Sequence, residues 1–185
     1  MKLHFILGGL LAFAALVAGT SARAGDGFEA VKCGGDVRAA LVGKKLDSSP
    51  AVDTEKKHAD IGLKDMGGDE LNDDLSSVSW NICGKEYFTV VASGGRIRDA
   101  LELPHHSHTA PHFTSLGCKI NGKPDGDLVV GVYDNTKVFK PETDSDMLPA
   151  TAAWTINGKT GKMTPLAVAG LKCPRIDIIT SDSDP

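Results

Sequence analysis

SVSWNICGKEYFTVV, residues 77–91, decides the fold of this 185-residue chain. Apolar residues alternate with polar ones up to Ile82, and a run of aromatic and β-branched residues begins at Tyr87. Alternation with a period of two is typical of a strand with one buried face. Because Gly84-Lys85 between the two runs suits a tight turn, the stretch predicts an antiparallel β-hairpin.

Strand and turn signals continue toward the C-terminus. Asn121-Gly122 and Asn157-Gly158 are dipeptides that favour tight turns between strands. The aromatic residues Trp80, Tyr87 and Trp154 occupy strand positions, where packing in a core is the expected role. Further strands are predicted at residues 96–103, 116–120, 128–133, 152–156, 162–168 and 176–179.

Helical signals lie before this region. Asp36 is a predicted N-cap of a short amphipathic helix that ends at Gly43, and residues 54–61 have room for one or two helical turns. The acidic residues 65–74 are predicted to form a structured loop. The expected fold class is therefore α+β: mainly antiparallel β in a hairpin-rich sheet, open or closed into a barrel, with one short N-terminal helix.

Residues 1–24 have the three parts of a secretory leader. Lys2 gives a positive start, residues 5–19 are uncharged and largely apolar, and Ala22-Arg23-Ala24 is a small-x-small cleavage site. The apolar run is about 15 residues long, whereas a membrane-spanning helix needs roughly 20. We expect cleavage after Ala24, which leaves residues 25–185 as one globular domain.

The domain after the leader is acidic and ends in a polar tail, residues 181–185, that we expect to fray. Cleavage removes Lys2 and Arg23 but no acidic residue, so the net charge falls from −4 to −6. Nucleic acids and anionic membranes recruit clustered positive charge, so neither is an expected partner. The absence of an Asn-x-Ser/Thr sequon favours a bacterial source, with the periplasm or the extracellular space as location.

The four cysteines are predicted to form two disulfides. An even number of cysteines in an oxidising compartment favours structural bridges, and none of these lies in a Cys-x-x-Cys pair. Three pairings are possible, and the sequence does not choose among them. The candidates are Cys33, Cys83, Cys118 and Cys173.

A tract of histidines is the densest cluster of reactive groups. On an extended strand, residues two apart share a face, so His106 and His108 can approach one cation. Neutral imidazole suits zinc, copper or nickel. No defined ligand spacing accompanies the tract, so a solvated loop is favoured over a metal site. The four candidate ligands are His105, His106, His108 and His112.

Catalytic motifs are missing from the sequence. No Gly-x-Ser-x-Gly elbow occurs, and Ser107 between two histidines gives no triad, because neighbours on an extended chain point to opposite faces. The acidic residues 65–74 do not follow the spacing of a calcium-binding loop. We therefore predict no catalytic residue and no resident cofactor.

Two hypotheses follow for the function. The first is an exported, non-enzymatic module that binds an unidentified protein or small ligand through its sheet or loops. The second is a transition-metal-binding protein, or a metal-dependent enzyme, that uses the histidines of residues 105–112. The response of the protein's thermal stability to zinc, copper and nickel separates the two.

Overall fold

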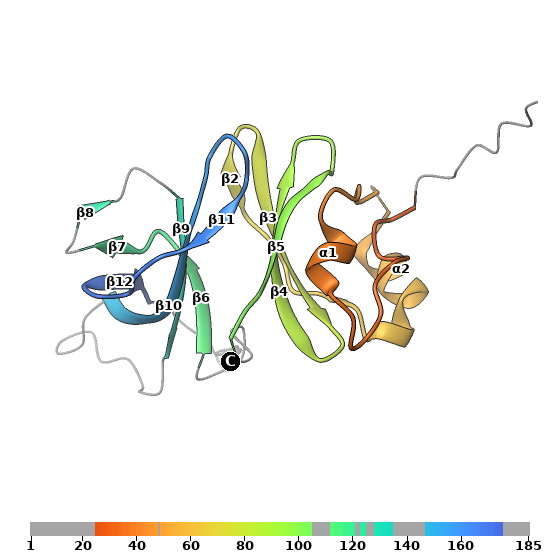
Figure 1. Cartoon of the computed structure of the whole chain (residues 1–185), viewed down its shortest axis with the longest axis horizontal. Coiled ribbons are helices and arrows are strands. Elements are labelled where there is room, and N and C mark those ends of the chain that lie inside the picture. Colours follow the sequence, from red (N-terminus) through yellow and green to blue (C-terminus); the bar gives the residue numbers. More distant parts are fainter. Residues whose placement is uncertain are drawn as a thin grey trace, which may run out of the picture.

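The computed structural model describes residues 25–47, 49–104, 112–120, 123–124, 128–134 and 147–175. In these residues two antiparallel sheets lie face to face, and a helical layer covers the outer face of the first sheet (Figure 1). The predicted fold, mainly antiparallel β with few helices, is confirmed. Neither sheet closes on itself in the described residues, so the barrel alternative is not found.

The first sheet is built on the hairpin read from residues 77–91. Its two strands face each other from Leu75↔Ala92 to Ile82↔Lys85, and the tight turn has positive φ at Cys83 (55°) and Gly84 (75°). Two consecutive positive φ angles are typical of the turns that join twisted antiparallel strands. The sheet order is β1 (Lys64–Asp65), β3 (Leu75–Ile82), β4 (Lys85–Ala92) and β5 (Ile97–Glu102), with β2 (Glu70–Asn72) also on β3.

The second sheet curls around its longest strand, β10. The first residues of β10 pair with β12, and the rest pair with β9, with an irregularity between Ala150 and Ala152. Gly117, at φ 86°, ends β6, so the single strand predicted at 116–120 is divided between two strands. The order is β6 (His112–Leu116), β9 (Leu128–Asp134), β10 (Met147–Ile156), β12 (Leu171–Pro174), β7 (Lys119–Ile120) and β8 (Lys123–Pro124), with β11 (Met163–Pro165) on β10.

The helical layer contains more than the one helix predicted. In α1 (Val37–Leu41) the Asp36 carboxylate accepts a hydrogen bond from the Ala39 N–H at 2.9 Å, as an N-cap does. A second helix, α2 (Ala51–Lys57), and a 3-10 turn, η1 (Ala59–Ile61), follow. The helical turns considered for residues 54–61 therefore belong to a longer segment that begins after Pro50.

The acidic segment 65–74 is only partly the predicted loop: Asp65 ends edge strand β1 and residues 70–72 form edge strand β2, while residues 66–69 and 73–74 are outside strands. Asp69 and Ser77 exchange backbone hydrogen bonds of 3.2 and 2.7 Å, and the Asn72 side chain accepts from the Asp74 and Leu75 N–H groups. Charged residues are compatible with a strand at the edge of a sheet, where one face and one side meet water. The loop prediction was therefore wrong for Asp65 and residues 70–72, whose pairing depends on contacts with β3.

Three hydrophobic clusters hold the layers together. The first lies between the helices and the first sheet, the second between the two sheets, and the third on the outer face of the second sheet. Strand β4 contributes side chains to the first and second clusters. Tyr87 and Val91 face the helices, while Phe88 and Val90 face the second sheet. This double burial explains the unbroken apolar run after Tyr87.

Both predicted disulfides are present, and their pairing is Cys33–Cys83 and Cys118–Cys173. The two bridges fit a protein of an oxidising compartment. In the part of the chain that the structure describes, no helix is both long and apolar enough to cross a membrane.

Candidate functional site

A groove of about 470 Å³ lies where the start of the described chain meets the segment after α1. One wall is the loop of residues 25–30, and the other is residues 43–45, which follow α1 directly. Three glycines leave much of the surface as backbone. The lining residues are Gly25, Gly27, Glu29, Ala30, Gly43, Lys44 and Lys45.

The wall of residues 43–45 is fixed by the edge of the first sheet. The Gly43 N–H donates to the Ile97 carbonyl, and the Ile97 N–H donates to the Lys44 carbonyl, both at 2.9 Å. The Arg96 guanidinium donates to the Gly43 carbonyl at 2.8 Å. The backbones of Lys45 and Arg96 also pair in an isolated antiparallel β-bridge. The backbone under both lysines is therefore rigid, while their side chains remain exposed.

The two walls touch at Gly27. Its φ of 95° lies in the region that favours glycine, and a Cβ there would lie 3.2 Å from the Lys45 carbonyl oxygen. A side chain at this position would press the walls apart. Gly27 therefore sets the width of the groove floor.

The wall of residues 25–30 is held by a buried charge cluster on the C-terminal end of α2. The Asp26 side chain is 3% exposed, and the His58 Nε2 lies 2.8 Å from both of its carboxylate oxygens. The Lys57 ammonium lies 2.7 Å from Asp26 Oδ2, and the Phe28 N–H donates to Oδ1 at 3.2 Å. A single carboxylate thus ties the loop to α2.

These contacts control the ionisation of Asp26. Burial alone acts to raise its pKa, but hydrogen bonds from Lys57, His58 and the Phe28 N–H stabilise the carboxylate and lower the pKa to about 2. The hydrogen bond to Asp26 in turn raises the pKa of Lys57. The cluster is therefore an ionic clamp at physiological pH.

An Asp–His contact also occurs in catalytic triads, where the histidine activates a nucleophile. Here the His58 side chain is 9% exposed, and its ring packs against Phe28 with centroids 5.6 Å apart. Phe28 in turn makes an edge contact with Trp80 at 4.9 Å. All four cysteines are in disulfides. Through Phe28 the pair packs against the first hydrophobic cluster, and it acts as a structural clamp.

The charged side chains on the two walls of the groove differ in whether they have hydrogen-bond and ion-pair partners. Glu29 accepts hydrogen bonds from the Asp26 N–H at 2.8 Å and the Gly27 N–H at 3.2 Å, and Lys57 Nζ lies 3.4 Å away. Lys44 and Lys45 form no ion pair with any described residue. The uncompensated charge at the groove is therefore positive, in a chain of net charge −4.

A second, smaller cavity of about 80 Å³ opens between the two sheets. Its lining includes the buried Ser77 and Ser79 of β3, residues 66–69, Phe88 of β4 and Leu116 of β6. This volume is sufficient for a few waters and too small for an organic ligand of ordinary size. The groove is the stronger candidate.

Three of the four candidate histidines, His105, His106 and His108, lie outside the described residues. His112 begins β6, and Asp134 is the residue opposite it in the register with β9. Among the residues that the structure describes, no group of three His, Cys, Asp or Glu side chains is placed to hold a metal ion.

The chain matches no protein-family model, no curated protein and no solved structure. The groove must therefore be interpreted from its own chemistry. Sequence reasoning missed it because Asp26 and His58 are 32 positions apart and neither belongs to a motif. The one local hint was the adjacent pair Lys44-Lys45 directly after the end of a predicted helix.

Proposed function

We propose that this chain is an exported, non-enzymatic binding module that holds a small organic anion in the groove between residues 25–30 and 43–45. The observation that carries the proposal is the pair Lys44 and Lys45, which lines the groove without an acidic partner in the described residues. Unpaired cations over exposed backbone are a favourable environment for a carboxylate or phosphate group.

The size and rigidity of the groove support this function. Its volume of about 470 Å³ falls in the range of small-molecule sites. Because the backbone of Lys44 and Lys45 is paired with residues 96 and 97, these lysines lose only side-chain freedom when they bind. The Ala30 methyl group offers an apolar contact beside the charges.

Export is the second component of the proposal. The leader-like residues 1–24 and the two disulfides support a location in the periplasm or outside the cell. In that setting the negative net charge repels polyanionic surfaces, while the positive charge of Lys44 and Lys45 attracts small anions to the groove.

The test is a binding titration of the processed protein at low ionic strength. We expect small carboxylates or phosphates to shift the amide NMR signals of residues 25–30 and 43–46. Lys44→Ala with Lys45→Ala should weaken binding about 10-fold or more, because both charges are lost. Lys56→Ala with Lys64→Ala, two exposed lysines outside the groove, is the matched control. Equal affinities for the two double variants, or no localised shifts with any anion, would contradict the proposal.

Metal binding by the histidine tract is the second candidate. The observation that favours it is the position of Asp134 opposite His112, since a carboxylate is a common hydrogen-bond partner of a metal-binding histidine. Zinc, copper or nickel should raise the melting temperature, and His106→Ala with His108→Ala should abolish the rise. A rise that survives both substitutions, or no rise with any metal, would remove this candidate.

A further inference from the structure

The Glu29 carboxylate lies against the first residues of the described chain, although its side chain is 46% exposed. It accepts hydrogen bonds from two consecutive backbone nitrogens, those of Asp26 and Gly27, at 2.8 and 3.2 Å. A Cβ built on Gly25 would overlap all three atoms of the carboxylate group. The carboxylate therefore lies directly against the α-carbon of Gly25.

The backbone nitrogen that precedes those of Asp26 and Gly27 belongs to Gly25. It is bonded to the same α-carbon that the carboxylate touches, so it lies within reach of a further contact with Glu29. Successive backbone nitrogens that converge on one point form an anion-binding concavity. Glu29 occupies such a concavity from within the chain.

We propose that cleavage after Ala24 creates an N-terminal ammonium on Gly25 that the Glu29 carboxylate holds in place, so that processing completes the wall of the groove. The inference rests on the export component of the proposed function. In the cleavage, water adds across the Ala24–Gly25 amide. The C–N bond breaks, the oxygen of water joins the Ala24 carbonyl carbon, and the Gly25 nitrogen gains protons. The catalyst is a processing endoprotease of the exporting cell.

The charges around this position favour a new cation. Asp26 and Glu29 bring two carboxylates, of which Asp26 is engaged by both His58 and Lys57. Lys57 reaches Glu29 at only 3.4 Å, so this carboxylate has room for a closer partner. Lys44 and Lys45 line the other wall of the groove, so the ammonium, held by Glu29, adds a third positive group beside the proposed anion site.

The identity of residue 25 agrees with this role. Any residue with a side chain would push the Glu29 carboxylate away from the Asp26 and Gly27 N–H groups. Because the overlap is only with the end of the Glu29 side chain, a larger residue at position 25 is compatible with the fold but displaces this carboxylate.

The test is a double-mutant cycle with defined N-termini. Four proteins are compared, which begin at Gly25 or at Ala24 and carry Glu29 or Glu29→Gln. Starting at Ala24 replaces the ammonium of Gly25 by an amide and moves the positive charge one residue away, about 3.8 Å along the chain. We expect the extension to lower the folding equilibrium constant about 3-fold when Glu29 is present and not at all with Glu29→Gln.

Two further measurements separate a charge contact from general loosening. The 3-fold effect should disappear in 1 M salt, where exposed charges are screened. Acylation of the terminal amine, followed by intact mass, should be several-fold slower with Glu29 than with Glu29→Gln. Glu55→Gln is the matched control, because Glu55 also accepts a backbone N–H, that of Asp65, on another element.

Additive effects of extension and Glu29→Gln at low salt would overturn the inference. So would equal acylation rates in the two proteins that begin at Gly25. The terminal mass of the naturally exported protein tests the cleavage itself. A start other than Gly25 would remove the export-site prediction, while the cycle on defined N-termini still reports on the contact between Glu29 and Gly25.

Discussion

The two halves of the molecule carry the same cross-link in different surroundings. In the half that contains the helices and the first sheet, Cys33–Cys83 joins the helical layer to the β3–β4 turn, and Cys33 is exposed. In the other half, Cys118 and Cys173 are 4% and 0% exposed and belong to the third core. Cys33–Cys83 is thus a surface disulfide, called the surface tether below, and Cys118–Cys173 is part of the third hydrophobic cluster.

The environment of the second bridge shows how closely it is packed. A Cβ on Gly131 of β9 would lie 2.5 and 2.6 Å from the two sulfur atoms. The sheet therefore has no side chain at the one position where the bridge lies against it. The surface tether has no such requirement, since a Cβ on the adjacent Gly84 would meet open space.

Replacing each pair of cysteines by alanine tests this difference most strongly. The bridges join residues 50 and 55 positions apart, so loss of the chain constraint costs about 4 kcal/mol in either case. Cys118→Ala with Cys173→Ala also leaves a cavity in a core, which should add about 2 kcal/mol. Urea unfolding of the two double variants measures both terms. Equal losses of stability would show that burial of the second bridge contributes nothing.

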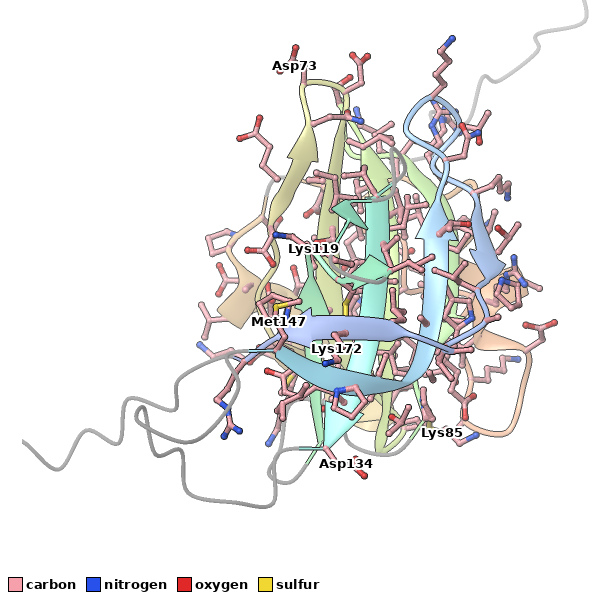
Figure 2. The ribbon with its side chains drawn as sticks, turned by 90° about the vertical axis from the view of Figure 1, so that its left-hand side faces the viewer. Asp73, Lys85, Lys119, Asp134, Met147 and Lys172 are labelled. Carbon is pink, nitrogen blue, oxygen red and sulfur yellow. A yellow bond between two sulfur atoms is a disulfide. The ribbon has the colours of Figure 1, made fainter. Side chains whose placement is uncertain are left out.

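Asp99 tests how firmly the two halves are joined. This fully buried carboxylate of β5 accepts hydrogen bonds from Arg38 Nη2 of α1 at 2.9 Å and from the Met163 N–H of β11 at 3.0 Å. Asp99→Ala leaves the Met163 N–H without this acceptor and should cost about 3 kcal/mol. Asp73→Ala, on an exposed turn (Figure 2), should change stability by less than about 0.5 kcal/mol. Similar values for the two variants in urea unfolding would contradict this role.

The Asp26 clamp predicts a pH dependence for the helical half. With a pKa of about 2 in the folded protein and an ordinary value of 3.8, its ionised form stabilises the fold fully above pH 4. That contribution, about 2 kcal/mol, is lost as the pH falls through 2. Asp26→Asn should therefore lower stability at pH 7 and flatten its decline between pH 4 and pH 2. A parallel decline in both proteins, measured by thermal unfolding, would rule out the clamp.

The smallest expected effect lies on the outer strands of the second half. Lys119 on β7 and Lys172 on β12 are directly opposite each other, and Figure 2 shows both on the same face. In the first sheet, by contrast, Lys85 pairs with Glu102 at 2.7 Å. Lys172→Glu converts a like-charge pair into an opposite one and should stabilise the protein by about 0.5 kcal/mol at low salt. A melting temperature that does not rise, or a rise unchanged in 1 M salt, would contradict the electrostatic cause.

The sequence predicted those parts of the fold whose signals are local. The β3–β4 hairpin follows from alternation on both sides of Gly84, and α1 follows from Asp36 before an amphipathic turn. Strands β1 and β2 were missed because their pairing depends on contacts with β3 and not on their own composition. The strand end at Gly117 was not predicted, because a single glycine in an apolar run does not by itself indicate where a strand ends.

The candidate site was beyond local patterns for the same reason. Its floor is a contact of Gly27 with the Lys45 carbonyl, and its clamp joins Asp26 to His58. Each residue type is ordinary at its own position. Only the path of the chain, which returns residues 43–46 to the edge of β5, brings them together.

The disulfide pairing has a consequence for how the chain is oxidised. The bridges join the first cysteine to the second and the third to the fourth, so the closed loops follow one another without overlap. In a chain that is translocated N-terminus first, Cys33 meets Cys83 before Cys118 has emerged. In such a chain both partners of the first bridge are present before a third thiol appears, so the observed pairing is the one that oxidation in the order of emergence favours.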